Sequence, residues 1–589
     1  QPPRHQQPIH VSRLSFRLRG SLASLRVENF LSTPRGREWD EGDVKMPRLL
    51  MSCSSPPPNP LLHKKWGRRH VRRRAGLAAL AVALLAGGAA AQEVRIGYGA
   101  AVTSVDPHFH ALTSNVAIHQ HIYQALVGQD EKLGLVPELA TAWRALDPTT
   151  WQFDLRPTAR WHDGRPFTAE DFAPNIERVA NVPNSPGRFT IYTRRITGVE
   201  VAGPHTLRIR TDGPHPLLPN QMAGLMLVSR AQADASTADF NAGRAAIGTG
   251  PYRFRAFTPG ARFDLARNDE YDGPREPWER VSFLLMTNTA SRVAALRAGD
   301  VQLIDQVPTD EVASLGRDPN LAVFSTPGVR NIYPYVDQGR DRTPGVTDNA
   351  GNPIDNPLRD VRVRRALSLA INRDGIVRSV MNGQAVASGQ LLPAGVVGHD
   401  PALRPDPFDV ERARRLLAEA GFPNGFQITL GGPNDRYVND ERVLQAIAQG
   451  WTRAGLRVRV EAQPSATFFG RAARNEFSVG LLGWGTGTGE PDSPLQSLIA
   501  TSEPRRGWGA VNRSGYSNPR LDELLAQALQ TLDVREREPL YRQATRIAME
   551  ELAIIPLHHQ VNIWATRRGF RYVARNDERT MATELKPER

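Results

Sequence analysis

"FQITLGGPNDRYVNDERVLQAIAQGWTRAGLRVRVEA", residues 426–462, is the stretch that decides the fold class. It is typical of a strand over 426–432, a helix over 439–455 and a second strand over 456–462, which together form a β-α-β unit. Because strands that alternate with helices are typical of sheets covered by helices, the sequence predicts an α/β protein.

The same alternation continues on both sides of this unit. Two helices with Asp360 and Asp409 as N-caps precede it, and their apolar residues recur at helical spacing. A buried strand over 477–484 follows it, and Asn518 caps a later helix. Shorter strands are expected earlier in the chain, over 92–99, 150–157 and 205–211.

The loop after the strand 477–484 is rich in glycine and reads "GTGTGEPD" over 485–492. Open α/β sheets place their ligand crevices at such strand ends. The glycines lack the spacing of a Walker loop or of a dinucleotide-binding loop, and Glu490 and Asp492 would repel a phosphate. We therefore expect this loop to face a ligand that is not a phosphate.

The net charge is concentrated in the N-terminal part of the sequence. The 589 residues carry a formal net charge of +13, of which residues 1–91 hold +11 and the remainder +2. A nearly neutral body lacks the basic surface that nucleic-acid binding requires. No nucleic-acid partner is therefore expected, and the length predicts several domains.

Residues 64–91 have the order of a signal peptide: a charged region, an apolar region and then small residues. We expect Sec-dependent export with cleavage near Ala91, and we interpret residues 1–63 as a disordered or mis-called leader. The apolar region is shorter than the about 20 residues of a transmembrane helix, so a retained signal anchor is the less favoured alternative. The sole cysteine, Cys53, precedes the apolar region, so neither a lipid anchor nor a disulfide is expected.

Several short motifs follow one another along residues 92–575. The most specific is "VPELATAWRALDPTTWQFDLRPTARWHDGRPFTAEDF" over 136–172. Further motifs are "IGTGPYRF" (247–254), "ARNDEYDG" (266–273), "AALRAGDVQLID" (294–305) and "LRDVRVRRALSLAINRDGIV" (358–377). In this order and at this spacing, they resemble the extracytoplasmic solute-binding proteins of family 5, the peptide and nickel group that serves ATP-binding-cassette importers.

This resemblance implies a two-lobed periplasmic-binding-protein fold of type II, of the large cluster C kind, with strands that cross at the hinge. The first lobe would comprise 92–332 together with 552–589, and the second lobe 333–551. Hinge motion would close the two lobes over a ligand. The implied protein is a periplasmic monomer that captures a peptide or a small organic solute and delivers it to the permease subunits of the importer. A nickel- or metallophore-binding protein of the same transporter class is the alternative.

The resemblance also places a ligand site on the loop after Trp484. Peptide binders of the family hold the ligand's α-ammonium group with an aspartate three residues after this tryptophan, and here that position is Gly487. Either Glu490 replaces the aspartate or the ligand carries no free amine there, because a buried ammonium without a carboxylate is costly. Gly485 and Thr486 belong to the same expected site.

Other residues of the expected site have two interpretations. Arg436 lies near the carboxylate-binding arginine of dipeptide binders, its planar guanidinium suits a carboxylate, and Tyr437 is beside it. Trp484 is either an aromatic side chain of the cleft or an ordinary core residue. Glu490 either contacts the ligand or stabilises its own loop.

Neither catalysis nor a bound metal is expected from the motifs. The sequence contains no G-x-S-x-G, H-E-x-x-H or S-x-x-K pattern, so no enzymatic activity and no cofactor are expected. Paired histidines raise the metal alternative, but side chains one or two positions apart on a helix point to different sides. These pairs are His108 and His110, His119 and His121, and His558 and His559.

Overall fold

The structure is a computed structural model, and it describes residues 92–186 and 189–588. The expected leader and signal peptide therefore lie outside the described residues. Within the described part of the chain, no helix combines the length and apolar character needed to cross a membrane.

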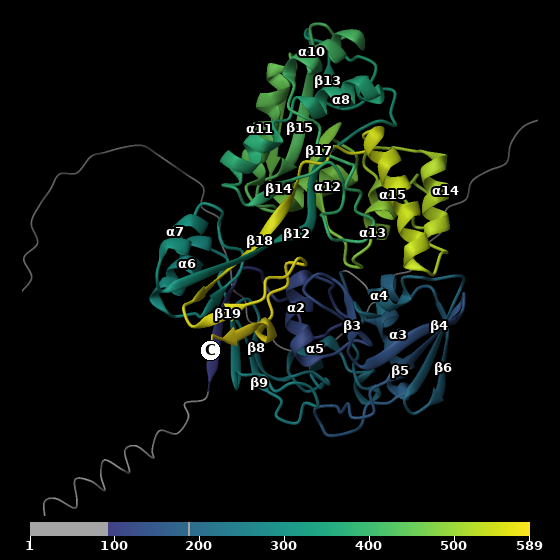
Figure 1. The fold of residues 1–589 in the computed structure, drawn as a ribbon, viewed down its shortest axis with the longest axis vertical. Helices are drawn as coiled ribbons and strands as arrows, with labels where there is room; N and C mark the ends of the chain where they lie inside the picture. Colours follow the sequence, from purple (N-terminus) through teal and green to yellow (C-terminus); the bar gives the residue numbers. More distant parts are fainter. Residues whose placement is uncertain (1–91, 187–188, 589) are drawn as a thin grey trace, which may run out of the picture. The chain divides into compact units, whose positions relative to one another are not determined.

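A mixed sheet of 12 strands forms the centre of the fold (Figure 1). Its order is β13-β15-β17-β12-β18-β11-β1-β10-β9-β8, with β14 added beside β18 and β16 beside β15. The strands are β1 (Glu93–Tyr98), β8 (Tyr252–Thr258), β9 (Arg262–Arg267), β10 (Arg280–Leu285), β11 (Leu303–Ile304), β12 (Leu321–Val336), β13 (Val346–Thr347), β14 (Ala385–Ala387), β15 (Gln427–Pro433), β16 (Arg457–Gln463), β17 (Val479–Trp484) and β18 (His558–Arg567).

Three smaller sheets complete the strands of the described chain. An antiparallel sheet has the order β4-β5-β7-β6, and β2 pairs with β3 and β19 with β20. Their bounds are β2 (Val127–Gln129), β3 (Leu135–Pro137), β4 (Ala140–Asp147), β5 (Thr150–Leu155), β6 (Ile196–Gly203), β7 (Thr206–Thr211), β19 (Phe570–Tyr572) and β20 (Leu585–Pro587). The strands predicted over 92–99, 150–157 and 205–211 are confirmed as β1, β5 and β7.

The helices begin where the sequence places their caps. Asp360 and Asp409 each accept a backbone N–H of the first turn, from Arg362 and Arg412, at 2.8 Å. Helices α14 and α15 lie side by side (Figure 1). The helices are α2 (Thr113–Ile122), α3 (Ala173–Asn181), α4 (Leu218–Met222), α5 (Thr237–Asn241), α6 (Thr289–Ala298), α7 (Val312–Arg317), α8 (Val361–Leu369), α9 (Arg373–Gly375), α10 (Val410–Glu419), α11 (Asp440–Arg453), α12 (Ser465–Ala473), α13 (Asp492–Pro494), α14 (Pro519–Ala528) and α15 (Val534–Glu550).

The stretch 426–462 forms the predicted β-α-β unit. Strands β15 and β16 pair in parallel, and α11 connects them. The helix buries an apolar face that includes Val443, Leu444, Ile447 and Trp451, so its helical spacing serves the core. The α/β class is confirmed.

Strands β12 and β18 are the central antiparallel pair of the large sheet (Figure 1). Along its 16 residues, β12 pairs first with β18 and then, from Asn331 to Val336, with β17. The register shifts between Pro327 and Asn331. A side chain at Gly328 would approach Asn562 Oδ1 to 2.8 Å, so glycine permits the close approach of the strands there.

Five apolar clusters divide the described chain into two parts. The buried residues of two clusters come from 332–557, and those of the other three come from 94–321 and 563–585. We use the names first lobe and second lobe for the residue sets expected from the sequence, 92–332 with 552–588 and 333–551. Strand β12 contributes to clusters of both parts, as a crossing strand does. The buried apolar residues of β18 belong to first-lobe clusters, and this strand directly follows Ile555 and Leu557 of a second-lobe cluster.

Candidate ligand-binding site

A cavity of about 530 Å³ lies where strands β15 and β17 end. The second lobe lines it with residues that follow these two strands, and the first lobe with Leu133, Tyr192 and residues 577–579. The shifted segment of β12 adds Val329 and Arg330, and Tyr333 follows on the same strand. Both lobes therefore enclose the cavity.

Six of the seven residues singled out from the sequence line this cavity: Arg436, Tyr437, Trp484, Gly485, Thr486 and Gly487. They meet because β15 and β17 pair in parallel, which brings their carboxyl ends to one edge of the sheet. Trp484 combines both of its interpretations, since it lines the cavity and also packs against an apolar cluster of the second lobe. Its indole N–H donates to Ser493 Oγ at 3.2 Å, which fixes the ring.

Hydrogen bonds within the loop after β17 hold its shape. Thr486 Oγ1 donates to the carbonyl of Glu490 at 2.6 Å, and the Thr488 hydroxyl donates to the Asp492 carboxylate. A side-chain carbon added at Gly487 would meet no atom within 4 Å. Gly487 is also absent from the glycines of positive φ, so its backbone would accept another residue. The position of the family's aspartate therefore offers the cavity no carboxylate.

Glu490 lies away from the cavity, and this corrects its expected place in the ligand site. Arg537 donates to both carboxylate oxygens, from Nε at 2.8 Å and from Nη2 at 2.6 Å, and both side chains are about 95% buried. A carboxylate that is bound by a guanidinium in this bidentate way is already satisfied. Glu490 instead anchors the loop to α15, the second of the two roles that the sequence left open.

Two carbonyl groups of this loop accept hydrogen bonds from the first lobe. Gln129 Nε2 donates to the carbonyl of Gly487 at 2.8 Å, and Asn220 Nδ2 donates to the carbonyl of Thr488 at 2.7 Å. Asn439 Nδ2 of the second lobe also donates to Thr309 Oγ1 of the first lobe, at 3.0 Å. The two lobes are thus joined by neutral hydrogen bonds beside the cavity.

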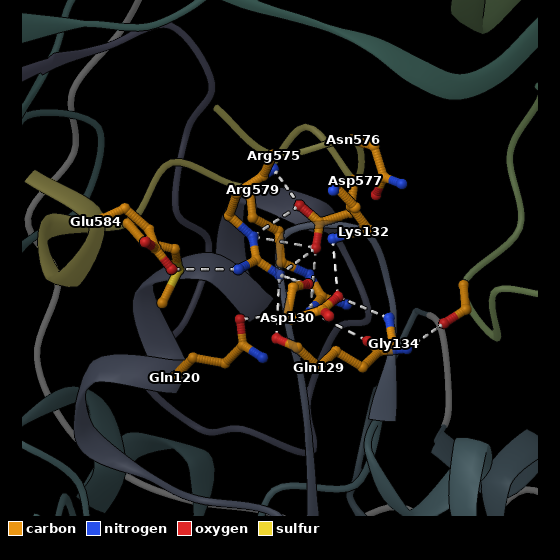
Figure 2. A network of polar contacts seen from close by, with 12 residues as sticks. Gln120, Gln129, Asp130, Lys132, Gly134, Arg575, Asn576, Asp577, Arg579 and Glu584 are labelled. Carbon is orange, nitrogen blue, oxygen red and sulfur yellow. Dashed lines mark hydrogen bonds and ion pairs between the residues drawn. The ribbon is translucent and has the colours of Figure 1, made fainter. Parts of the chain in front are cut away.

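Figure 2 shows a charged network in the first lobe, of which Asp577 and Arg579 line the cavity. Arg575 Nη2 donates to Asp577 Oδ2 at 2.7 Å and to the carbonyl of Asp130 at 2.9 Å. Arg579 Nη1 donates to Gln129 Oε1 at 3.4 Å, and its guanidinium lies 3.6 Å from Asp577. The network therefore connects a cavity-lining arginine to the amide that contacts the Gly487 loop.

A second cavity of about 550 Å³ shares four lining residues with the first: Arg330, Arg436, Tyr437 and Glu578. Arg330 binds both oxygens of Glu578, at 2.7 and 2.9 Å. This ion pair raises the pKa of Arg330, chiefly through the charge of Glu578. A closed ion pair thus contributes to the walls of both cavities.

Sequence reasoning missed several residues of the cavity of about 530 Å³, which we call the main cavity. Arg513 lies in a loop without a recognisable pattern, and the charged segment 575–579 looks like a solvated surface run. Tyr333 could have been found, because it directly follows residue 332, the expected boundary between the lobes. The remaining positions depend on loop packing that periodicity does not encode.

Most of the paired histidines have structural partners, although neither ring nitrogen of His558 has a hydrogen-bond partner among the described residues. His119 Nε2 donates to the carbonyl of Ser104 at 2.8 Å, and His121 Nε2 accepts the N–H of Ala582 at 2.9 Å. Burial lowers the pKa of both rings to about 4, which keeps them neutral. Within residues 92–186 and 189–588, no group of three or more His, Cys, Asp or Glu side chains could hold a metal ion. None of the histidines in that range lines the main cavity.

Comparison with known proteins places this geometry among solute-binding proteins. Residues 134–504 match the model of the bacterial extracellular solute-binding proteins, family 5 Middle. The glutathione-binding protein GsiB of Shigella boydii is 30% identical over 505 residues, which cover 82% of this chain and 93% of the relative.

Solved structures show the same fold. The periplasmic binding protein DppA of Helicobacter pylori, in complex with the peptide STSA, superposes with a TM-score of 0.69 at 22% identity and covers 84% of this chain and 98% of its own. NikZ of Campylobacter jejuni, in complex with Ni(L-His), superposes with a TM-score of 0.68 at 18% identity and covers 84% and 99%. The two-lobed periplasmic-binding-protein architecture is therefore confirmed, and peptide and nickel carriers share it.

Proposed function

Because the chain belongs to the bacterial extracellular solute-binding proteins of family 5, we propose that it captures a peptide or a small organic solute in the main cavity for an ATP-binding-cassette importer. The observation that carries this proposal is the cavity of about 530 Å³ between the two lobes, lined by Trp484, Arg436 and residues 577–579. A cavity of this size suits a small ligand, and a few polar groups among apolar walls fix its orientation. Delivery to permease subunits follows from the same family membership.

Glutathione is the first solute to test. Relatives about 30% identical along most of their length are named glutathione-binding proteins. Glutathione is a small peptide with carboxylates, which fits a cavity that contains arginine side chains. The nickel alternative fits less well, because the cavity-lining residues include no histidine, cysteine or methionine.

A ligand-release experiment tests the proposal directly. The protein is purified under native conditions and denatured, and the released small molecules are identified by mass spectrometry. Calorimetry with glutathione then measures whether that solute binds. We expect a co-purified or titratable small molecule, and a folded protein that releases and binds none would contradict capture.

Closure should accompany binding. A ligand that contacts both lobes stabilises the closed form relative to the open form, so binding shifts the population toward closure. Small-angle scattering with and without a bound ligand should show a smaller radius of gyration in its presence. An unchanged radius would favour a rigid site.

Export and assembly complete the proposal. Sec-dependent export with cleavage near Ala91 would deliver a monomer to the periplasm, with lobe boundaries near residues 332 and 551. N-terminal sequencing of the exported protein and its mass in solution test these points. A start far from Gln92, or a stable dimer, would contradict them.

A further inference from the structure

The charged side chains that line the main cavity fall into two groups. Glu578 is bound by Arg330, and Asp577 is bound by Arg575 and faces Arg579. Each of the two acidic residues of the lining is therefore already paired with arginine. Arg436 and Arg513 differ, because neither has a carboxylate partner in the part of the chain that the structure describes.

The two unpaired arginines act on different parts of the cavity. The guanidinium carbon of Arg436 lies 5.3 Å from the ring centre of Tyr437, and its charge lowers the pKa of that tyrosine against the larger rise caused by burial. Arg513 acts in the same way on Tyr333 and Tyr335, whose pKa values burial raises. The two arginines come from different loops: Arg436 follows β15 and lines both cavities, whereas Arg513 lies in the loop before α14 and lines only the first of them.

Tyr333 supplies an independent sign of a missing partner. Its side chain is 1% exposed and lines the cavity, and its hydroxyl has no hydrogen-bond partner among the described residues. A buried hydroxyl without a partner is unfavourable, so such groups are normally satisfied. Because Arg513 lines the same cavity, an acceptor oxygen of a ligand there could meet this donor and a positive charge together.

We infer that the captured solute carries two separate anionic groups, one bound by Arg436 and the other by Arg513 with the Tyr333 hydroxyl as an additional donor. The inference rests on the proposed capture of a small solute. Guanidinium groups bind carboxylates through paired, charge-assisted hydrogen bonds, so a dicarboxylate would satisfy both arginines. Arg436 is exposed and Arg513 is half-buried, so a ligand in the cavity can reach both guanidinium groups without displacing a protein carboxylate.

A free ammonium group of a ligand would find no unpaired carboxylate among the residues that line the cavity. Gly487 has no side chain, Glu490 is bound by Arg537, and the two lining acids are bound by arginines. An ammonium would have to displace an arginine from one of these carboxylates. The solute's affinity should therefore depend on its two anionic groups and little on an amine.

Selection from a defined mixture tests this inference. Protein freed of endogenous solute is incubated with di- and tripeptides, their N-acetylated and amidated forms, and small organic acids, from singly cationic to doubly anionic. Mass spectrometry identifies what is retained. We expect doubly anionic members, and N-acetylation should not reduce their retention.

Variants then assign the two anionic groups. Calorimetry measures the affinities of the best-retained dicarboxylate and of its two mono-amides for the variants Arg436→Gln and Arg513→Gln. The control variant is Arg505→Gln, because Arg505 is exposed and lies outside the cavity. Each cavity variant should weaken the dicarboxylate by about 10- to 100-fold, and each mono-amide should be insensitive to one of the two variants. Arg505→Gln should leave every affinity unchanged.

Other outcomes would overturn the inference. Retention of neutral or cationic members only, or effects of Arg436→Gln and Arg513→Gln no larger than those of the control, would count against two anionic groups while leaving capture intact. Retention of no member by a folded protein would count against the anionic class and against capture. If either glutamine variant fails to fold, Arg513→Lys and Arg436→Lys keep the charge and test the loss of bidentate geometry.

Discussion

Arginine borders the cavity from both lobes, but the two lobes use it differently. In the first lobe, Arg575 and Arg579 belong to a closed network with Asp577, and Arg575 also binds backbone carbonyls. In the second lobe, Arg436 and Arg513 line the same space without a carboxylate partner among the described residues. The paired arginines are bound by carboxylates of the protein itself, whereas the unpaired ones are free to bind a group from outside.

This difference separates stability from recognition. Removing one member of a buried ion pair leaves its partner charged and desolvated, which is strongly destabilising. Removing an unpaired arginine that is exposed or half-buried, as Arg436 and Arg513 are, leaves no partner charge behind and should change stability little. Substitutions in the first-lobe network should therefore lower the free energy of unfolding, and those at Arg436 or Arg513 should lower ligand affinity.

Arg575→Met should have the largest effect. The side chain of Arg575 is 5% exposed and that of Asp577 is 6% exposed, so the variant leaves a buried carboxylate with Arg579 alone. We expect a loss of about 3–5 kcal/mol in the free energy of unfolding, measured by urea denaturation. Arg513→Gln and the exposed control Arg505→Gln should each stay within about 0.5 kcal/mol of the parent. A loss below about 1 kcal/mol for Arg575→Met would erase the contrast between the lobes.

The pH dependence of stability tests Asp492, an acidic residue that has no arginine partner of its own although it lies beside an ion pair. Asp492 lies beside the Glu490–Arg537 pair, and burial, with the charge of Glu490, raises its pKa to about 7. The folded state thus keeps a proton that the unfolded state loses near pH 4, so stability from this group falls as the pH rises from about 4 to 7.

Asp492→Asn should remove this part of the pH dependence. Between pH 5 and pH 8 the parent should lose about 2–3 kcal/mol more than the variant, measured as urea-derived free energies of unfolding at both pH values. The comparison between the two proteins cancels the other titrating groups. Equal losses would mean that Asp492 titrates normally.

The sequence predicted the elements that ordinary periodicity and capping encode. The β-α-β unit of 426–462 and the helices capped by Asp360 and Asp409 formed as expected. Six of the seven expected site residues line the cavity because each lies at or just after a strand end that the sheet brings to one edge. Glu490 was ambiguous, since its partner Arg537 is 47 residues away and only tertiary packing joins them.

The pairing state of the arginines could not be predicted for the same physical reason. The local sequence does not show which of Arg436 and Arg575 is paired, because each has acidic residues close by. Whether a carboxylate reaches a guanidinium depends on loop geometry at a few ångströms. Only the three-dimensional structure therefore shows which arginines of the cavity have carboxylate partners.

Gly487→Asp would add a carboxylate to the second-lobe part of the cavity, where Arg436 and Arg513 have no carboxylate partner. The position is open, and its backbone conformation suits any residue, so the side chain should be accommodated. The new acid should favour free amines by about 1.5–3 kcal/mol, the value of a charge-assisted hydrogen bond, and should weaken dicarboxylates. Calorimetry with a tripeptide and its N-acetylated form measures the shift. Gly487→Asn, which adds similar volume without charge, is the control, and an equal response to both variants would rule out an electrostatic cause.

Gln129→Ala should have the smallest effect, because it removes one neutral hydrogen bond that joins the lobes. Gln129 accepts from Arg579 of the paired network and donates to the carbonyl of Gly487, so it connects the satisfied side of the cavity to the second lobe. Loss of that bond should disfavour the closed form by about 0.5–1.5 kcal/mol and weaken ligand binding about 2- to 10-fold. Gln120→Ala is the matched control, since Gln120 also accepts from Arg579, at 3.5 Å, but makes no bond to the loop. Calorimetry gives the affinity, and scattering with increasing ligand gives the closed fraction. If the two alanine variants behave alike, the bond to Gly487 contributes nothing to closure, and Asn220, which donates to Thr488, becomes the remaining first-lobe contact to this loop.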